Sequence, residues 1–457
     1  MIAPGPRPSN REAELSVHRP AVEAPVAAEP YRREERKVAA VAMPSEGAPV
    51  DLLLKGGHVI DPRHSISALL DVAIADGKIA QVAPDVPSGG AKRVLDVGGC
   101  YVTPGIIDMH CHVFAGHARS SLSVPPALST FSCGVTTVVD AGTSGWRDFP
   151  EFKERIIDHS KIRVLAYVNI VGQGMAGPWE HDIAEMRPAL AAAVAEEYGD
   201  VVVGIKTAHY WANRPFDAGH PPWAAVERAV EAGELCRKPV MVDFWPAPER
   251  PYADLLLKKL RPGDIHTHVF AQQFPILDDD GAVQPHMWEA RERGIIFDLG
   301  HGAASFWYRN AVPAIQQGFL PDSISTDLHT GNINGPVFDM LTTMNKCLNM
   351  GISLEGVLAR STWAPAQEIG HPELGSLAAG NVADVAVFRL LEQGRFPLVD
   401  CGKATLVGDR LLDCVLTVRA GEAVYNPAGL GLPEWQAAPD AYWWDPARRV
   451  SMRPRGA

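Results

Sequence analysis

The sequence predicts an α/β protein: a (β/α)8 TIM-type barrel flanked by a small β-sandwich domain made from both chain ends. Eight short, continuously apolar runs alternate with helix-like stretches between positions 102 and 329. This alternation is typical of parallel strands that helices cover on both faces, and eight strands close such a barrel. Segments rich in β-forming residues, punctuated by Gly, Asp and Pro, stand before and after this region, which indicates that the two ends fold together.

Five regions follow one another along the chain. Residues 1–48 are rich in Pro, Ala, Arg and Glu without periodicity, which predicts a disordered extension. Residues 49–101 are expected to form the first part of the β-sandwich, residues 102–368 the barrel domain, and residues 369–431 the second part of the β-sandwich. The tail, residues 432–457, is expected to pack on a surface or on a neighbouring subunit of a homo-oligomer.

Within the barrel region, the individual strands and helices follow from the periodicity of apolar residues. Apolar residues spaced by three and four predict helices at 188–199, 222–237 and 337–351. The eight strands are expected at 102–110, 135–142, 162–170, 201–207, 238–244, 264–270, 294–301 and 323–329.

Composition excludes several functional classes. The net charge of −12 argues against a nucleic-acid-binding surface, which needs clustered Lys and Arg. The seven cysteines are spaced singly, without a C-x-x-C pair, which indicates reduced thiols rather than a disulfide framework. No apolar run approaches the roughly 20 residues that span a bilayer. We therefore expect a cytoplasmic protein that binds neither nucleic acid nor membrane.

Two histidines end the first barrel strand as His-Cys-His. Side chains alternate along a strand, so His110 and His112 face one side while Cys111 faces the other. Catalytic groups of a TIM barrel lie at the carboxyl ends of its strands, and two imidazoles there can bind one metal ion. The alternative is a pair of exposed loop histidines.

A lysine ends the fourth apolar run, VVVGIK. Burial of the Lys206 ammonium in the barrel mouth is costly unless the group is paired or modified. Reaction with carbon dioxide would give an anionic carbamate that can bridge two metal ions. The alternative is a lysine ion-paired with a carboxylate of the pocket.

Two further candidates end the sixth and eighth runs. His268 ends DIHTH and can supply an imidazole to a metal. Asp327 ends SISTD and can be both a ligand and the group that accepts a proton from metal-bound water. Each of these residues alone is more often structural, but five such groups at the ends of four strands predict a metal site.

These segments resemble the amidohydrolase superfamily. Three segments are similar to those near the beginning and end of members of this superfamily: DLLLKGGHVID, YVTPGIIDMHCH and LGSLAAGNVADVAVF. The resemblance extends from Asp51 to about Pro427. Four further segments resemble the dihydroorotase-like deacetylase branch of this superfamily: GIKTAHYW, LRPGDIHTHVF, FDLGHGAASF and SISTDLHT. The resemblance implies two divalent ions, most commonly Zn²⁺ with Mn²⁺ or Fe²⁺ as alternatives. It further implies this ligand set: His110 and His112 on the more buried ion, carboxylated Lys206 as the bridge, His268 on the second ion, and Asp327 on the first ion and as the acid/base.

One position departs from this resemblance. The superfamily usually has a histidine after the fifth strand, where this chain has Asp243 in VMVDF. A carboxylate still ligates zinc, and we expect Asp243 to be a ligand, although it favours harder ions such as manganese or iron. Alternatively Asp243 is not a ligand and the second site is weak or empty, in which case His266, two residues before His268, is expected to face the same side and compensate.

Other polar and aromatic residues past the strand ends are candidates for contact with substrate. By the same resemblance, His301 in FDLGH is expected to contact the substrate, with a hydrogen-bonded structural histidine as the alternative. The small residues of GHGAAS would let the substrate approach backbone amides. Trp211 and Asn332 are expected to line the pocket, with ordinary packing as the alternative. Tyr210, Trp307 and Arg309 are further lining candidates, whereas His117, His209, His220, His286 and His329 are not expected to be ligands.

The resulting functional hypothesis is a metal-dependent hydrolase acting on a small-molecule substrate. Metal-activated hydroxide would cleave an amide or ester bond of a small acylated carboxylate, as a deacetylase or aminoacylase does. The first alternative is a cyclic amidase similar to dihydroorotase or hydantoinase. A deaminase fits less well, because many mononuclear deaminases lack a bridging lysine. A non-catalytic barrel scaffold is the alternative from another class, and the intact His, Lys and Asp pattern argues against it.

Overall fold

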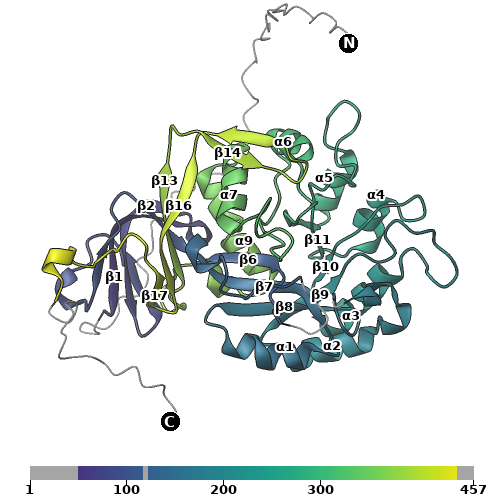
Figure 1. Ribbon diagram of the computed structural model, residues 1–457, viewed down its shortest axis with the longest axis horizontal. Helices are drawn as coiled ribbons and strands as arrows, with labels where there is room; N and C mark the ends of the chain where they lie inside the picture. Colours follow the sequence, from purple (N-terminus) through teal and green to yellow (C-terminus); the bar gives the residue numbers. More distant parts are fainter. Residues whose placement is uncertain (1–49, 117–121, 176, 440–457) are drawn as a thin grey trace, which may run out of the picture. The chain divides into compact units, whose positions relative to one another are not determined.

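The structure is a computed structural model that describes residues 50–116, 122–175 and 177–439. These residues belong to one compact unit. One sheet contains strands from both chain ends, and a parallel sheet is formed by the region between them (Figure 1). The predicted extension at 1–48 and residues 440–457 of the predicted tail lie outside the described residues.

The two chain ends share one eight-stranded sheet. Its order is β17-β16-β13-β5-β1-β2-β3, with β4 paired to β1. The antiparallel pairing of β5 with β13 joins the N-terminal and C-terminal parts, as in Val102 opposite Val387, so the expected association of both ends is confirmed. Buried Leu54, Val72 and Leu416 belong to its apolar core. Its strands are β1 (Leu52–Asp61), β2 (Ile66–Ala75), β3 (Lys78–Ala83), β4 (Val94–Asp96), β5 (Tyr101–Pro104), β13 (Val385–Leu391), β16 (Leu411–Arg419) and β17 (Glu422–Tyr425).

The barrel region contains a parallel sheet whose seven strands neighbour one another in sequence order. Each strand coincides with one of the first seven predicted runs. Most are buried from end to end, as expected for strands covered on both faces. They are β6 (Ile106–Cys111), β7 (Val135–Gly145), β8 (Arg163–Asn169), β9 (Val202–Thr207), β10 (Val240–Val242), β11 (Ile265–His266) and β12 (Ile296–Phe297).

The eighth predicted run, 323–329, differs from the prediction because it forms isolated bridges instead of a regular strand. Ser323 bridges Asp298, which follows β12, and Leu328 bridges Cys111 of β6. The segment therefore lies between the two edge strands of the sheet. The backbone N–H of Asp327 donates to the carbonyl of His110, and the φ of Asp327, 51°, is in the left-handed region.

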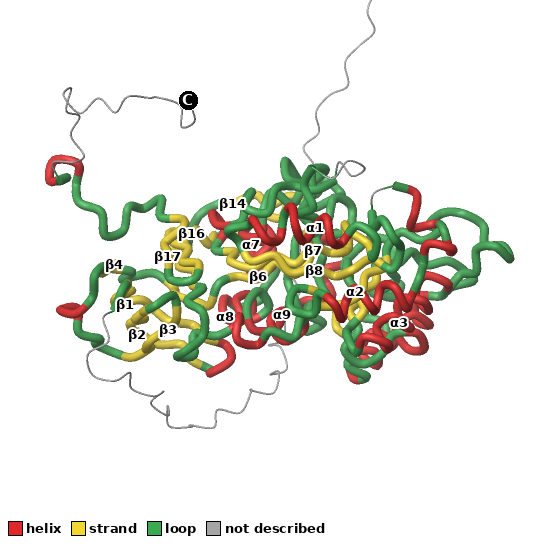
Figure 2. The backbone as a smooth tube through the Cα atoms, turned by 90° about the horizontal axis from the view of Figure 1, so that it is seen from below, coloured by secondary structure: helices red, strands yellow, loops and turns green. Residues whose placement is uncertain are grey.

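Helices pack on the outer side of the parallel strands. Figure 1 shows α1, α2 and α3 along β7, β8 and β9, and Figure 2 shows α1 and α2 beside β7 and β8. The predicted helices at 188–199, 222–237 and 337–351 are confirmed as α2, α3 and α7. A separate hairpin, β14 (Phe396–Val399) and β15 (Thr405–Gly408), contacts α7. The helices are α1 (Phe149–Arg155), α2 (Pro188–Glu197), α3 (Ala224–Cys236), α4 (Tyr252–Asp254), α5 (Pro285–Glu292), α6 (Tyr308–Gln316), α7 (Met340–Asn349), α8 (Leu354–Ala359) and α9 (Trp363–Glu368).

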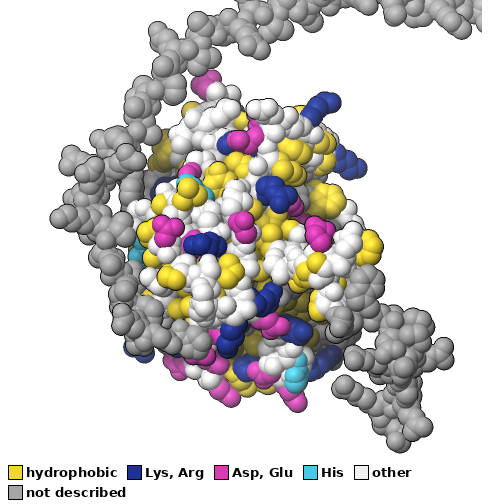
Figure 3. All heavy atoms as spheres, turned by 90° about the vertical axis from the view of Figure 1, so that its left-hand side faces the viewer, with side chains coloured by type: hydrophobic (Ala, Val, Ile, Leu, Met, Phe, Trp, Pro, Cys, Tyr) yellow, Lys and Arg dark blue, Asp and Glu magenta, His cyan; other side chains and the backbone are white. Residues whose placement is uncertain are grey.

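Two surface properties bear on function. Among the described residues, no helix combines the length and the apolar character needed to cross a membrane. Figure 3 shows Lys and Arg side chains interspersed with Asp and Glu side chains on the face that it presents.

Candidate metal centre

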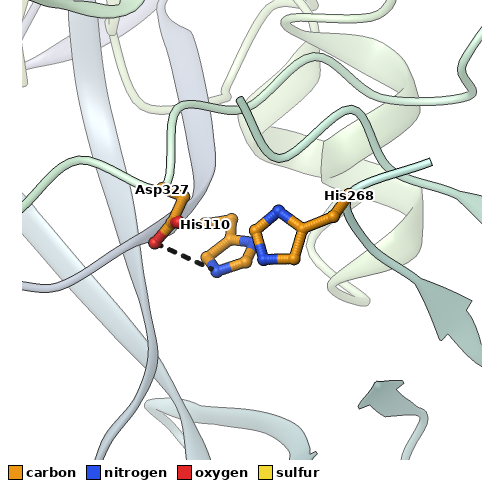
Figure 4. Close-up of side chains that lie close together, drawn as sticks. All are labelled: His110, His268 and Asp327. Atoms are coloured by element: carbon orange, nitrogen blue, oxygen red, sulfur yellow. Dashed lines mark ion pairs between the residues drawn. The ribbon is translucent and has the colours of Figure 1, made fainter. Parts of the chain in front are cut away.

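Three side chains from separate elements converge at the carboxyl ends of the barrel strands. His110 lies in β6, His268 follows β11, and Asp327 lies in the eighth run. Their ligand atoms all lie within 4.8 Å of one another, and Nε2 of His110 is 3.6 Å from Oδ1 of Asp327 (Figure 4). Two imidazoles and a carboxylate at this spacing form a possible metal site.

The His-Cys-His segment places both imidazoles on the same side, as its alternation predicts. Nε2 of His112 lies 3.0 Å from Oδ1 of Asp327, the same oxygen that His110 approaches. Cys111 instead donates a hydrogen bond to the carbonyl of Val139 at 3.4 Å. Nδ1 of His112 is hydrogen-bonded to Oγ1 of Thr143 at 2.8 Å, so its Nε2 is the nitrogen that faces the centre.

A buried carboxylate fixes the tautomer of His110 through a threonine. The Thr267 hydroxyl donates to Asp298 Oδ2 at 2.7 Å, so it accepts from Nδ1 of His110 at 2.9 Å. The lone pair of His110 then resides on Nε2, the orientation that a metal ligand requires. Burial, followed by the charge of Lys206, lowers the pKa of His110 to about 3. The imidazole is therefore neutral.

Lys206 is a buried amine beside this imidazole. Its side chain is 1% exposed, and Nζ lies 3.4 Å from Nε2 of His110. Gly142 makes room for the lysine stem, since a Cβ there would lie 2.6 Å from Cβ of Lys206. Among the described residues no carboxylate forms an ion pair with Lys206, so the ion-paired alternative is not observed. Burial lowers the pKa of Lys206, which favours the neutral amine.

Asp243 and His268 form the other half of the centre. Oδ2 of Asp243, directly after β10, lies 3.7 Å from Nε2 of His268. Nδ1 of His268 is hydrogen-bonded to the carbonyl of Gly300 at 2.5 Å, which leaves Nε2 directed at Asp243. Burial raises the pKa of Asp243, but the neighbouring charges of His268, His209 and Lys206 outweigh it and lower the pKa below its usual value. The carboxylate is therefore anionic.

A fourth imidazole, which the sequence did not predict to take part, reaches Asp243. Nε2 of His209 lies 3.2 Å from Oδ2 of Asp243, and its Nδ1 lies 3.1 Å from Oε2 of Glu180. Desolvation lowers the pKa of His209, but the hydrogen bond and charge of Glu180 and the charge of Asp243 raise it to about 10. His209 and Glu180 lie in connections beyond strand ends, where periodicity gives no signal.

Comparisons with known proteins agree with this geometry. No model of a known protein family matches the sequence. A deacetylase of Enterococcus faecalis is 32% identical over 381 residues, which are 82% of this chain and 99% of that protein. A deacetylase of Agrobacterium fabrum is 32% identical over 329 residues, 69% of this chain and 77% of that protein.

Two solved structures resemble the fold at 30% sequence identity. The crystal structure of an adenine deaminase has a TM-score of 0.75 and covers 82% of this chain and 100% of that chain. The crystal structure of a dihydroorotase has a TM-score of 0.72 and covers 82% and 97%. The chain belongs to the amidohydrolase superfamily. It is a hydrolytic enzyme of that superfamily, whose members generally use a divalent metal ion.

In this amidohydrolase, His266 does not compensate for the missing fifth-strand histidine. Strand β11 ends at His266, and His268 has a φ of 64°, so alternation does not extend to it. The His266 ring packs edge-on against Phe274 and Tyr252. Neither of its ring nitrogens has a hydrogen-bond partner among the described residues. The expectation that His266 faces the same side as His268 is wrong.

The polar groups of the three predicted substrate-binding residues are engaged within the protein. His301 is fully buried; its Nδ1 donates to the Gly302 carbonyl at 3.0 Å and its Nε2 accepts from Nζ of Lys346 at 2.7 Å. Nδ2 of Asn332 donates to the Asp327 carbonyl at 2.6 Å, which supports the left-handed backbone there. The indole nitrogen of Trp211 donates to the Pro215 carbonyl, and its ring stacks on His220.

The donors of this amidohydrolase suit divalent metal ions. The imidazoles of His110, His112 and His268 have Nδ1 fixed by hydrogen bonds and Nε2 directed at a carboxylate. Imidazole and carboxylate donors together are typical of zinc, iron and manganese sites. The buried amine of Lys206 completes the group. These residues fit the ions that the superfamily uses.

Proposed function

We propose that this amidohydrolase is a deacylase that cleaves the amide or ester bond of a small acylated carboxylate. The observation that carries the proposal is the convergence of the imidazoles of His110, His112 and His268 with the carboxylates of Asp243 and Asp327. The two relatives named deacetylase, which match most of this chain, support acyl removal over other superfamily reactions. The substrate is a small molecule.

The proposed centre holds two divalent ions, zinc or alternatively manganese or iron. His110, His112 and Asp327 would hold the first ion, and His268 and Asp243 would bind the second. Lys206 would bridge them after its neutral amine attacks carbon dioxide and releases a proton to give a carbamate. The depressed pKa of Lys206 and its lack of an ion-pair partner among the described residues support this modification.

The ions would supply a water molecule of lowered pKa and polarise the scissile carbonyl. Asp327 is the group placed to accept the proton of that water. Burial raises the pKa of Asp327, but its electrostatic and hydrogen-bonding interactions with the His110 and His112 imidazoles outweigh burial and hold the pKa well below its usual value, so the side chain is an anionic acceptor. It then passes the proton to the leaving nitrogen or oxygen as the acyl bond breaks.

Gly302 lets the chain pass close to this carboxylate. A Cβ at that position would lie 2.7 Å from Oδ2 of Asp327, and its φ is 60°. The small residues after His301 thereby leave space beside Asp327, where the leaving group must approach to receive a proton. This arrangement is consistent with acyl transfer to water.

Cyclic amide hydrolysis is the second candidate. It is supported by the likeness to a dihydroorotase structure over 82% of this chain, and the same ions and Asp327 would serve it. A non-catalytic scaffold would have no need of buried imidazoles oriented through Thr143, Thr267 and Gly300.

A substrate panel tests the proposal. Protein reconstituted with Zn²⁺ or Mn²⁺ is assayed against N-acetyl amino acids, O-acetyl hydroxy acids, dihydroorotate and hydantoins, with release of acetate or ring opening as the readout. We expect release of acetate from at least one acylated carboxylate, lost on chelation. Turnover of the cyclic substrates alone would replace the deacylase by the cyclic amidase, and no metal-dependent turnover would refute both.

A further inference from the structure

The second half of the centre lacks the imidazole that usually follows the fifth strand, and another imidazole lies beside the residue that replaced it. Oδ2 of Asp243 is flanked by Nε2 of His268 at 3.7 Å and by Nε2 of His209 at 3.2 Å. Two imidazole nitrogens thus converge on one carboxylate oxygen. A divalent ion can bind such a group of donors by displacing the protons on the imidazole nitrogens.

His209 is held in this position by a buried carboxylate. Oε2 of Glu180 lies 3.1 Å from Nδ1 of His209, and Oε1 of Glu180 accepts a hydrogen bond at 3.2 Å from Asn169, the last residue of β8. Glu180 is 7% exposed. A carboxylate that fixes the second nitrogen of an imidazole is the usual support of a metal-binding histidine. The ring of His209 is therefore oriented through Glu180 by a residue of barrel strand β8, and not only by its own loop.

The backbone of this loop is also constrained. His209 has a φ of 54°, in the left-handed region that non-glycine residues rarely adopt. The backbone N–H of Trp211 donates to Nδ1 of His181, next to Glu180, at 3.1 Å. The imidazole itself remains 56% exposed, so an ion can reach Nε2. A strained backbone that the surrounding structure maintains, next to an accessible imidazole nitrogen, is typical of a functional site.

We infer that His209 is a ligand of the second metal ion and stands in for the absent fifth-strand histidine, with Glu180 as its positioning residue. This inference rests on the metal centre of the proposed function. The second ion then has the imidazoles of His268 and His209 and the carboxylate of Asp243. A second imidazole restores the preference for zinc that a carboxylate alone would weaken.

Metal content of a matched pair of variants tests the inference. His209→Ala removes the imidazole, and His220→Ala, in the same connection and stacked on Trp211, removes a histidine that does not approach Asp243. Each protein is loaded with Zn²⁺ and dialysed, and the bound zinc per chain is measured by elemental mass spectrometry. Thermal unfolding checks that each variant is folded. We expect two equivalents in wild type and His220→Ala, and one in His209→Ala. Two equivalents in His209→Ala, or equal loss in both variants, would overturn the inference.

A rescue separates a ligand from a residue that only shapes the loop. Replacing Asp243 by His in the His209→Ala background restores a histidine at the fifth strand, and we expect the second equivalent to return. Absence of rescue, with the first equivalent retained, would overturn the role of His209. Glu180→Gln should weaken binding of the second ion by about 10- to 100-fold without changing thermal unfolding of the metal-free protein. Unchanged affinity would remove Glu180 as the positioning residue.

The same measurements distinguish failure of the inference from failure of the proposed function. If wild type binds one ion and still releases acetate, the second site and the inference are overturned, whereas the proposed deacylase reaction stands. If wild type binds no metal, both are overturned. Visible absorption of Co²⁺-loaded protein gives a readout independent of activity, and we expect the spectrum of the second ion to change in His209→Ala but not in His220→Ala.

Discussion

Replacement of Lys206 by Met should change stability and metal binding in opposite directions. The side chain is 1% exposed, its amine lies 3.4 Å from Nε2 of His110, and no ion pair is formed with it among the described residues. A buried cation without a counter-ion lowers the stability of the metal-free protein, and an apolar replacement of similar volume commonly recovers about 1–4 kcal/mol. The same substitution removes the only nitrogen of that side chain that could become a carbamate.

The pH dependence of this gain has a definite sign. Burial lowers the pKa of Lys206 below its unfolded value of about 10.4, so folding opposes protonation at any pH below that value. The destabilisation is therefore full at low pH and disappears as the pH rises through the unfolded pKa. We expect Lys206→Met to stabilise the metal-free protein more at pH 7 than at pH 10.

Urea unfolding of chelator-treated protein in CO2-depleted buffer measures the stability, and metal analysis of reloaded protein measures binding. Lys346→Met is a matched control, because Lys346 is another fully buried lysine, hydrogen-bonded to His301 and to the Pro336 carbonyl. We expect the control to keep its metal. A Lys206→Met protein that is less stable than wild type at pH 7, or one that keeps both metal equivalents, would refute the reasoning.

Three further substitutions probe the groups around this lysine. Asp327→Asn should lower kcat by about 10²- to 10⁴-fold, the usual contribution of a general base, with the Zn²⁺ content largely retained; unchanged kcat would remove Asp327 from the chemistry. Gly302→Ala places a Cβ 2.7 Å from Oδ2 of Asp327 at a φ of 60°. We expect the free energy of unfolding, measured in urea, to fall by about 1–3 kcal/mol and kcat to fall as well. A fully active, equally stable variant would contradict this packing. Thr267→Val removes the hydroxyl between His110 and Asp298 and should weaken Zn²⁺ binding by about 10- to 100-fold, whereas Thr267→Ser should not; equal affinities in both would show that the hydroxyl is dispensable.

The metal-binding candidates were predictable because they follow buried strands. Alternation puts His110 and His112 on one side, and barrel geometry brings strand ends such as those at Lys206 and Asp327 to a common rim. Their contacts in the structure follow that expectation. Asp243 also lies at this rim. Because an aspartate stands where the superfamily usually has a histidine, the sequence left two alternatives for this residue, a ligand or a non-ligand.

Local backbone irregularities and long connections were not predictable. His266 faces Phe274 because β11 ends there and the backbone at His268 is left-handed, and no hydrophobic pattern encodes that turn. His209 reaches Asp243 from a loop, and its other ring nitrogen contacts Glu180, which is far from it in sequence. A histidine in a loop has no periodic neighbours, so its partners depend on tertiary contacts that a sequence pattern does not contain.

Polar anchoring of the eighth run explains how Asp327 reaches the centre without a regular strand. Thr326 donates from its backbone N and its Oγ1 to Asp108 at 3.0 and 2.5 Å, and Ser325 donates from Oγ to Asp298 at 2.7 Å. Apolar residues at these positions would remove one hydroxyl donor from each of two buried carboxylates, which is costly. The side-chain bonds that hold the segment between β12 and β6 therefore also set the position of Asp327. Substitutions that loosen this closure should weaken metal binding even when they lie outside the ligand set.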